Sequence, residues 1–304
     1  MITGCAGFIG SHATDYFLKN GHFVVGYDAL TYAGKMENIK NCLESDKFIF
    51  VKGDICDTDL VCELVKKYNI SWIINFAAET HVDNSITSDG KFIHSNISGV
   101  KSLLDVCRLN KIKLFQISTD EVYGSCKEGS FSKHSKLLPS NPYSATKAAA
   151  EHIITAYKNT HNVDYIIVRP SNNFGPRQHN EKFLPTIIKS LNCGKKIPLY
   201  GSGENVRDWL YVKDNVEIIY NIWKLSPANE IYNISLLNEK TNLEIVNQIL
   251  EIMDKNFEDN VSFVKDRPGH DFRYSIDNEK MLSLGIDVQT NFKKNLLSTI
   301  ESFK

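Results

Sequence analysis

A heptapeptide near the start of the chain, Gly4-Cys5-Ala6-Gly7-Phe8-Ile9-Gly10, sets the expected fold, because glycine recurs at every third position. Such spacing permits a tight turn and lets the N-terminus of the following helix approach a pyrophosphate. The apolar run Phe23–Tyr27 is typical of the next strand, and Asp28 follows Gly10 by about 20 residues. A carboxylate there binds the adenosine ribose hydroxyls and repels a 2′-phosphate, and no arginine stands beside it. The pattern therefore predicts NAD rather than NADP as cofactor.

Residues 1–170 alternate short apolar runs with stretches whose apolar residues recur at helical spacing. The predicted strands are Ile2-Thr3, Phe23–Tyr27, Phe48–Lys52, Trp72–Phe76, Leu114–Ser118 and Tyr165–Val168. The predicted helices are Ser11–Lys19, Thr58–Lys67, Ser95–Leu109 and Ser144–His161. Such alternation predicts an α/β fold, a Rossmann-type doubly wound parallel sheet that binds ligands beyond the carboxyl ends of its strands. The first strand is shorter than the usual five or so residues, which leaves open whether the natural chain begins earlier.

The sequence becomes irregular after Pro170, where glycines, prolines and aromatics mix with helical stretches at Phe183–Leu191 and Leu243–Met253. We expect this part to form a smaller C-terminal substrate-binding lobe. The helical pattern Asp214–Trp223 and the run Ile231–Ile234 are expected to return to the main sheet. The predicted division assigns residues 1–171 and about 208–236 to the NAD-binding domain. The lobe then comprises about 172–207 and 237–304.

Tyr143 and Lys147 lie four residues apart at a helix start that Asn141-Pro142 introduces. Residues at this spacing share one helix face, so the ammonium should favour the phenolate and lower the tyrosine pKa. The spacing alone is common on solvated surfaces, but here it follows a predicted dinucleotide loop and a strand ending in Ser118-Thr119. Tyr143 is therefore the expected catalytic base, and Thr119 can share the substrate oxygen with it.

Two adjacent acids, Asp120 and Glu121, follow the same strand directly. Acids at a strand end can be ordinary solvated loop charges. Here they would lie beside a nicotinamide and a Tyr/Lys pair, and oxidation of an alcohol at such a site requires no carboxylate. An acid and a base together indicate an added elimination step.

The chain resembles the extended short-chain dehydrogenases, and most of all the nucleoside-diphosphate-glucose 4,6-dehydratases, along nearly its whole length. Besides the glycine loop, the matching motifs are Asp28–Gly34 (DALTYAG), Ala77–Asp83 (AAETHVD), Thr119–Gly124 (TDEVYG), Pro142–Lys147 (PYSATK), Arg169–Pro176 (RPSNNFGP), Arg207–Tyr211 (RDWLY) and Arg267–Asp271 (RPGHD). So many ordered matches make the resemblance very specific.

The resemblance implies a residue-by-residue assignment of catalysis. Tyr143 takes the proton of the sugar 4-hydroxyl while hydride passes from C4 to NAD, and Lys147 supports the tyrosine. Glu121 then removes the C5 proton, and Asp120, held protonated by a raised pKa, protonates the departing 6-hydroxyl. Hydride returns to C6, giving a 4-keto-6-deoxy sugar nucleotide. The implied cofactor contacts are Gly4, Gly7, Phe8, Ile9, Gly10, Asp28, Asp54, Ile55, Ala77, Tyr143 and Lys147.

The sugar-nucleotide contacts follow from the same resemblance. Asn172, Arg207 and Arg273 match positions that hold the diphosphate, for which the planar arginine fork is well suited. Further contacts are implied at His81, Lys182, Leu184, Pro198 and Tyr200, with His270 a weaker candidate.

The identity of the base, dTDP or UDP, stays open. Asn84 stands where many bacterial dTDP-glucose enzymes carry arginine and resembles the rhamnose synthases that use UDP-glucose. Pro268–Asp271 is closer to the dTDP type, although Phe272 replaces a frequent arginine or leucine. The two bases differ by one methyl group, which a pocket discriminates by only about 1–3 kcal/mol.

Composition excludes several classes of function. Lys plus Arg total 35 against 36 Asp plus Glu, so no net field favours nucleic acid or an anionic membrane. No apolar run approaches the roughly 18 residues of a membrane span, and no signal peptide is apparent. The 7 cysteines are scattered without a C-x-x-C pair, which argues against a disulfide framework or bound metal and favours a cytoplasmic setting.

The resemblance also implies a homodimer in which Ser95–Leu109 and Ser144–His161 form a four-helix bundle. Val100, Leu103, Leu104, Val106 and Cys107 cover more than one helical face, which favours a second apolar contact beyond the sheet.

Three alternative functions differ in the residues that they require. A nucleotide-sugar 4-epimerase would share the glycine loop, Thr119, Tyr143 and Lys147, but it has no need of Asp120 and Glu121. A glucuronate decarboxylase would often keep the glutamate and lose the aspartate. A catalytically silent NAD sensor predicts a broken Tyr/Lys pair or missing acids, and the sequence keeps all of these residues.

Overall fold

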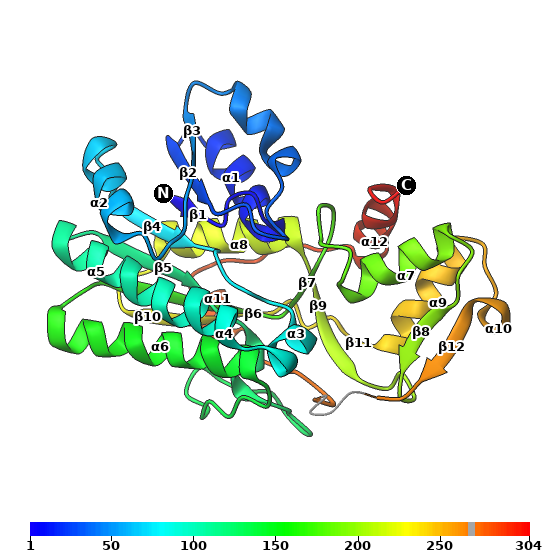
Figure 1. Cartoon of the computed structure of the whole chain (residues 1–304). Coiled ribbons are helices and arrows are strands. Elements are labelled where there is room, and N and C mark those ends of the chain that lie inside the picture. Colours follow the sequence, from blue (N-terminus) through cyan, green and yellow to red (C-terminus); the bar gives the residue numbers. More distant parts are fainter. Residues whose placement is uncertain (267–270) are drawn as a thin grey trace.

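Seven parallel strands form the main sheet of the computed structural model, which describes residues 1–266 and 271–304. The strand order is β10-β6-β5-β4-β1-β2-β3, with β1 between β2 and β4. Figure 1 shows this sheet beside a smaller lobe. The bounds are β1 Ile2–Thr3, β2 Val24–Asp28, β3 Phe48–Lys52, β4 Trp72–Asn75, β5 Lys113–Ile117, β6 Tyr165–Pro170 and β10 Glu230–Ile234. The predicted doubly wound sheet, including the late return of a strand, is confirmed.

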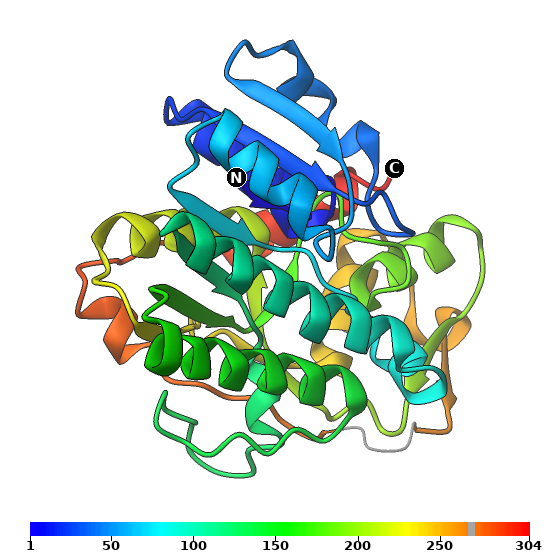
Figure 2. The same ribbon diagram turned by 60° about the vertical axis from the view of Figure 1, so that its left-hand side comes forward.

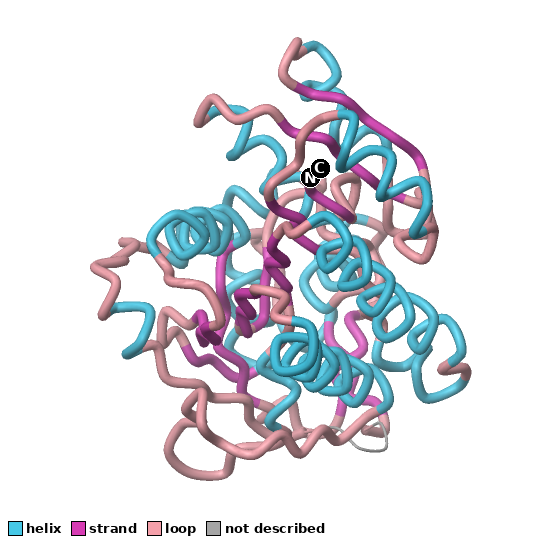
Figure 3. The backbone as a smooth tube through the Cα atoms, turned by 90° about the vertical axis from the view of Figure 1, so that its left-hand side faces the viewer, coloured by secondary structure: helices cyan, strands magenta, loops and turns pink. Residues whose placement is uncertain are grey.

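Helices cover both faces of the sheet, as Figure 3 shows. Successive side chains of a strand point to opposite faces, so Val24, Ile74 and Ile166 join one apolar core while their neighbours join the other. The first core includes α1 (Phe8–Lys19) and α8 (Val212–Leu225), and the second α2 (Thr58–Lys67), α5 (Val100–Asn110) and α6 (Pro142–His161). Burial on both faces explains why these strands are continuously apolar.

The helices α5 and α6 lie side by side (Figure 2), but the reason given above for a second contact on α5 is wrong. The five residues on which it rested are all buried in the second core of the same chain. The helix packs against the sheet and against both α2 and α6, and this requires a wide apolar stripe. The exposed apolar residue of this helix is instead Leu109, at 61%.

The second lobe has a separate apolar core beneath two small sheets, ordered β11-β9-β7 and β12-β8. The strands are β7 Asn172–Phe174, β8 Ile197–Tyr200, β9 Val206–Tyr211, β11 Glu239–Thr241 and β12 Val261–Val264. The helices are α7 Phe183–Asn192, α9 Asn242–Ile252 and α12 Phe292–Glu301. The helices α7 and α9 were predicted within two residues at each end.

Packing between the main sheet and the second lobe differs from the predicted division of the chain into two domains. Leu210 of β9 packs in the core of the main sheet, whereas its neighbours Trp209 and Tyr211 pack in the lobe. Met281 of α11 (Glu279–Leu282) and Ile286 also join the main sheet, although they fall in the range predicted for the lobe. The assignment of the two ranges to cofactor and substrate domains stays a prediction.

The connections contain short helical segments. They are η1 Met36–Glu44, α3 Val82–Thr87, α4 Gly90–Phe92, η2 Ile93–Gly99, η3 Asp120–Tyr123 and α10 Phe257–Asn260. The π-helical η2 leads directly into α5, so the single helix predicted from Ser95 to Leu109 is irregular in its first part. Among the described residues, no helix combines the length and apolar character that a membrane span requires.

Leu103, which is fully buried in α5, allows a test of the second core. We expect Leu103→Ala to lower the free energy of unfolding by about 2–5 kcal/mol, because it leaves a cavity between helix and sheet. Leu225→Ala, at a site 51% exposed, should change it by less than about 0.5 kcal/mol. Denaturant unfolding measures both, and equal losses would contradict the packing.

Candidate active site

The glycine loop turns tightly between β1 and α1. Gly4 has φ +65°, and a Cβ on Gly10 would lie 2.1 Å from the Gly4 carbonyl oxygen. Only glycine at position 10 allows this approach of helix and loop. The N-terminus of α1 consequently opens onto the carboxyl edge of the sheet, with Phe8 and Ile9 in its first turn. This is the geometry predicted for an anion site.

Asp28, the last residue of β2, is buried and fixed by two backbone amides. The Ala6 N–H donates to Oδ2 and the Leu30 N–H to Oδ1, each at 2.8 Å. Burial raises the pKa of Asp28, and the two hydrogen bonds oppose this shift. Each carboxylate oxygen keeps a second lone pair, so the group can still accept hydrogen bonds from a ribose.

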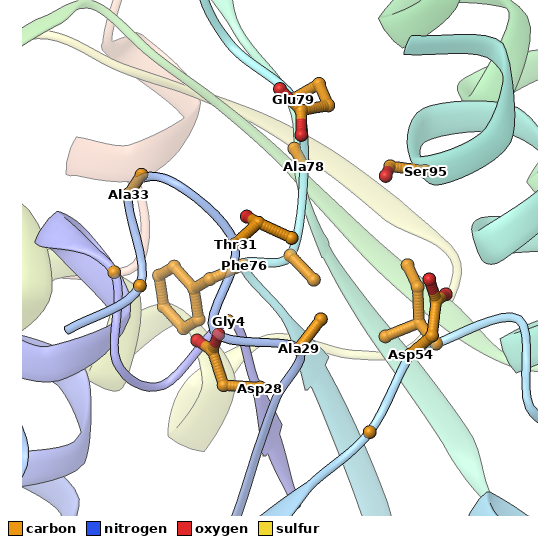
Figure 4. Close-up of a pocket in the computed structure, with 15 residues that line it drawn as sticks. Gly4, Asp28, Ala29, Thr31, Ala33, Asp54, Phe76, Ala78, Glu79 and Ser95 are labelled. Carbon is orange, nitrogen blue, oxygen red and sulfur yellow. The ribbon is translucent and has the colours of Figure 1, made fainter. Parts of the chain in front are cut away.

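A pocket beside the loop contains the residues predicted to bind the adenosine half of the cofactor (Figure 4). Gly4, Gly7, Asp28, Asp54, Ile55 and Ala77 line it, together with Thr31, Phe76, Glu79 and Ser95. Asp54 follows β3, and its Oδ2 lies 3.1 Å from Nε2 of His94. The lining is neutral or acidic, as suits a ribose without a 2′-phosphate.

A second, adjoining pocket brings together all five predicted catalytic residues. It is lined by Thr119, Asp120, Glu121, Tyr143 and Lys147, and also by Phe8, Ile9 and Gly10 of the glycine loop. The acids lie on η3 directly after β5, and Tyr143 and Lys147 lie on α6. The structure therefore joins the dinucleotide loop, the Tyr/Lys pair and the two acids at one site.

Local capping sets the start of α6 and so the position of Tyr143. The Asn141 side chain accepts from the Ser144 N–H at 2.9 Å, Ser144 completes a capping box, and Pro142 occupies the first turn. The Tyr143 N–H donates to Ser85 of α3. These contacts fix the first turn of the helix, as Asn141-Pro142 predicted.

Asp120 is almost fully buried, and its pKa is raised to about 8. Burial is the main cause, followed by the charge of Glu121, while a hydrogen bond from Thr119 opposes the shift. Oδ1 lies 3.2 Å from the Thr119 hydroxyl, and Oδ2 has no hydrogen-bond partner among the described residues. Asp120 therefore carries a proton at neutral pH and can donate it into the pocket.

The pKa of Tyr143 differs from the expectation that Lys147 lowers it. Burial raises this pKa well above its usual value, and the charge of Glu121 adds to the shift, while a hydrogen bond from Thr119 lowers it. The Lys147 ammonium instead donates to the carbonyl oxygen of Ile117 at 2.6 Å. Its own pKa is lowered to about 8 by burial, against which the charge of Glu151 acts.

A line of buried polar groups crosses the sheet and ends at the same carbonyl. Thr3 donates to Asn75 at 2.5 Å, Asn75 to Gln116 at 2.8 Å, and Gln116 to the oxygen of Ile117 at 2.8 Å. This chain connects β1, β4 and β5 and joins the residue before the glycine loop to the acceptor of Lys147. Buried amides of this kind need such partners to offset desolvation.

Two of the predicted substrate contacts, Asn172 and Lys182, line the catalytic pocket. The Asn172 Oδ1 atom is buried without a hydrogen-bond partner among the described residues, and the Lys182 ammonium donates to Thr80 O at 2.7 Å. His81 caps α3, with its Nε2 atom 3.8 Å from Glu181 of the pocket wall. Asn172 and Lys182 therefore line the same pocket as the five predicted catalytic residues, and His81 lies beside its wall.

The remaining predicted substrate contacts are not among the described residues that line the two pockets. Arg207 donates to the carbonyls of Val206 and Asp271 at 2.7 and 2.9 Å, and Arg273 forms a two-pronged pair with Glu239 at 2.7 Å. Leu184 is 1% exposed and packs in the lobe core, because α7 turns its apolar stripe inward. Pro198 and Tyr200 lie on β8, and Tyr200 is 38% exposed. His270 and the rest of residues 267–270 lie outside the described residues.

A loop that the sequence patterns did not predict closes one side of the catalytic pocket. Arg177, Gln178, His179 and Glu181 line it, and Glu181 Oε2 lies 3.3 Å from Nδ1 of His179. The available signal was the unbroken polar run from residue 177 to 182, directly before a helix. Asn96 was also missed; its side chain bonds both Glu79 and Thr146 and so ties the loop after β4 to α6.

Comparison with known proteins gives matches over nearly the whole chain. The model of the family described as GDP-mannose 4,6 dehydratase matches residues 1–298. The low-salt glycan biosynthesis protein Agl12 of Haloferax volcanii is 43% identical over 305 residues, covering 100% of this chain and 97% of that protein. The dTDP-glucose 4,6-dehydratase of Haemophilus influenzae is 38% identical over 325 residues, covering 99% and 96%.

Solved structures give the same pattern. The dTDP-glucose 4,6-dehydratase DesIV of Streptomyces venezuelae, crystallised with NAD, has a TM-score of 0.95 and 37% identity, covering 99% of this chain and 95% of that one. The UDP-glucose 4-epimerase of Thermus thermophilus, also a complex with NAD, has a TM-score of 0.91 and 27% identity, covering 99% and 97%. The fold is therefore common to dehydratases and epimerases.

The pKa of Asp120 can be tested directly. We expect the protonated carboxyl signal of Asp120, assigned by its loss in Asp120→Asn, to persist at neutral pH and disappear around pH 8. Infrared spectroscopy of protein labelled with ¹³C-aspartate measures it. Asp164, whose pKa the Lys158 hydrogen bond lowers, is the internal control and should stay ionised. Ionisation of Asp120 together with Asp164 would contradict the buried acid.

Proposed function

Because this chain belongs to the GDP-mannose 4,6 dehydratase family, we propose that it is an NAD-dependent nucleotide-sugar 4,6-dehydratase. It converts dTDP-glucose or UDP-glucose to the 4-keto-6-deoxy sugar nucleotide. The observation that carries the proposal is the pair Asp120 and Glu121 in one pocket with Tyr143 and Lys147. An acid that is protonated at neutral pH is the group that departure of a hydroxide equivalent needs.

The residues at the first pocket suit NAD. Gly4, Gly7 and Gly10 allow a pyrophosphate to approach α1, and Asp28 offers its carboxylate to a ribose. Asp54, Ile55 and Ala77 would surround the adenine, with Phe8 and Ile9 on the side of the catalytic pocket. When bound, NAD supplies an oxidised nicotinamide that accepts and returns a hydride and whose positive charge favours a tyrosine phenolate.

Each catalytic side chain then handles one proton or orients one oxygen. Thr119 and Tyr143 hold the sugar 4-hydroxyl, and Tyr143 removes its proton as C4 is oxidised. The ketone acidifies the proton on C5, which Glu121 takes. Asp120 gives its proton to the 6-hydroxyl, so that water leaves. Lys147, charged below about pH 8, supports Tyr143 from the same helix.

The diphosphate and sugar would be held by Asn172, Lys182, His81, Arg207 and Arg273. The unpartnered Oδ1 of Asn172 supports its part in this role. Arg207 and Arg273 already donate within the protein, so each would have to exchange a carbonyl or the Glu239 carboxylate for phosphate oxygens. Pro198 and Tyr200 would contact the base, and Leu184 would support this wall from the core of the lobe.

Relatives named dTDP-glucose 4,6-dehydratase make dTDP-glucose the first substrate to test. The main alternative is a 4-epimerase, which the likeness to the Thermus thermophilus enzyme favours. An epimerase returns hydride to C4 and releases no water, so Asp120 and Glu121 would have no function in it.

We also propose a homodimer built on α5 and α6, with Leu109 of α5 exposed at 61% and Ile93 of the preceding η2 exposed at 44%. Light scattering should give twice the mass of one chain.

The deciding assay incubates purified protein with dTDP-glucose and UDP-glucose in parallel, without added NAD. Mass spectrometry detects loss of one water, and alkaline ultraviolet absorbance detects the 4-keto sugar. We expect water loss from at least one substrate, and the relative rates identify the base. Conversion without a change in mass would favour the epimerase, and no change even with NAD supplied would refute both activities for these substrates.

Replacement of Asp120 by asparagine separates the steps. We expect Asp120→Asn to slow water loss by about 10²–10⁴-fold, because the leaving hydroxide loses its proton donor. Exchange of the C5 hydrogen in deuterated water should continue, since Tyr143 and Glu121 remain. Asp164→Asn, a substitution in a surface ion pair, serves as the control. Water loss at the wild-type rate in Asp120→Asn would contradict the role of the acid.

A further inference from the structure

A buried ion pair that the mechanism does not use lies directly behind the catalytic residues. Glu151 is on α6, one turn after Lys147, and is 3% exposed. The Arg169 Nε atom of β6 donates to both carboxylate oxygens at 3.1 Å, and the Arg169 Nη2 atom also binds Oε2. Such a pair is costly to bury and often no more stabilising than apolar packing. The buried position of this ion pair therefore indicates a role other than stabilisation of the fold.

The pair holds both ends of the segment that carries the two catalytic acids. At one end, the Ser118 hydroxyl donates to Glu151 Oε1 at 2.5 Å. At the other end, the guanidinium of Arg169 lies over the Tyr123 ring, 4.7 Å from its centroid, and donates to the Tyr123 hydroxyl. Tyr123 in turn donates to Asn233 of β10 at 2.8 Å. Residues 118 to 123 are thereby fixed to three elements.

We propose that Glu151 is a positioning residue of the dehydratase site, which fixes the segment 118–123 with Arg169 and supplies the buried counter-charge of Lys147. The inference rests on the proposed function, because it assigns Glu151 a part in that reaction. Among the described residues, Glu151 lines neither of the two pockets. It therefore acts through Lys147 and Ser118.

Glu151 differs from the other charged groups near Lys147 in its effect on the pKa of this lysine. Burial lowers the pKa of Lys147 to about 8, and among the described residues Glu151 is the group whose charge raises it. Other titratable side chains on the elements packed against α6 are Asp83, Lys91, His94, Lys101, Asp105, Cys107, Arg108, Asp120, Glu121, Tyr123, Tyr165 and Arg169. Besides Lys147 and Glu151, the titratable side chains of α6 itself are Tyr143, His152, Tyr157, Lys158 and His161.

Deprotonation of Lys147 sets the direction of the expected pH effect. Lys147 is charged below its pKa and loses its proton as the pH rises through that value, so activity should fall on the alkaline side. Removal of the Glu151 charge lowers the pKa, and the fall begins at lower pH. In Glu151→Gln we expect the alkaline limb of kcat to move down by about one pH unit, equivalent to a tenfold change in the equilibrium. The KM should change little, because Glu151 does not contact the sugar nucleotide.

Matched variants separate charge from fold. Asp105→Asn removes an acid of α5 that pairs with Lys101 and binds Tyr157 of α6, and it should leave the alkaline limb in place. Glu151→Asp keeps the charge and should restore the limb toward that of the wild type. If Glu151→Gln alone fails to fold around an unpaired Arg169, Glu151→Gln/Arg169→Met removes both charges, and a downward shift smaller than one pH unit is expected, because loss of the Arg169 charge raises the pKa of Lys147.

A direct titration of Lys147 distinguishes failure of this inference from failure of the proposed function. NMR of protein labelled with ¹³C at the lysine Cε atoms, with Lys147→Arg for assignment, reports the pKa without any turnover. A lower Lys147 pKa in Glu151→Gln, with the shifted kcat limb, supports the inference. An unchanged Lys147 titration overturns it, even if the wild type dehydrates its substrate. A wild type that dehydrates neither sugar nucleotide overturns the proposed function, whatever the titration gives.

Discussion

Parallel pairing of all seven strands is the constraint on which the site depends, because it collects their carboxyl ends at one edge of the sheet. Asp28 and Asp54 follow β2 and β3, and Thr119 follows β5, so residues far apart in sequence meet there. Apolar cores on both faces hold this arrangement, and they leave the edge as the place where polar side chains gather. The chemistry of the molecule is confined to that edge and to the lobe beside it.

Local patterns predicted most of the fold and the residues that gather at the edge. The glycine loop, the strand ends and the Asn141-Pro142 cap each act within a few residues, so the sequence contains their signals. The partners of Lys147, Arg207 and Arg273 could not be predicted, because Ile117, Asp271 and Glu239 are brought to them by tertiary packing. The predicted effect of Lys147 on Tyr143 failed for the same reason, since tertiary packing buries the phenol and directs the Lys147 ammonium to Ile117.

Burial shifts the pKa values of Asp120 and Lys147, which line the same pocket, in opposite directions. It raises the pKa of Asp120 and lowers that of Lys147, so both groups are drawn toward neutrality near the same pH. Glu151 and Arg169 form a buried ion pair beside these two groups. The site therefore places two side chains whose protonation can change next to a pair of opposite charges.

The polar chain from Thr3 to Ile117 has a direction, because every donor in it points from β1 toward β5. Its dipoles are consequently aligned, and in a low-dielectric interior each hydrogen bond polarises the next. The positive end of this row, the Gln116 amide nitrogen, faces the Ile117 oxygen that also receives the Lys147 ammonium. A change in the hydrogen bonding of Thr3, beside the first glycine of the loop, would therefore change the electrostatic potential at Lys147. One row of hydrogen bonds thus connects the backbone turn proposed to accommodate a pyrophosphate with the side chain proposed to support proton transfer.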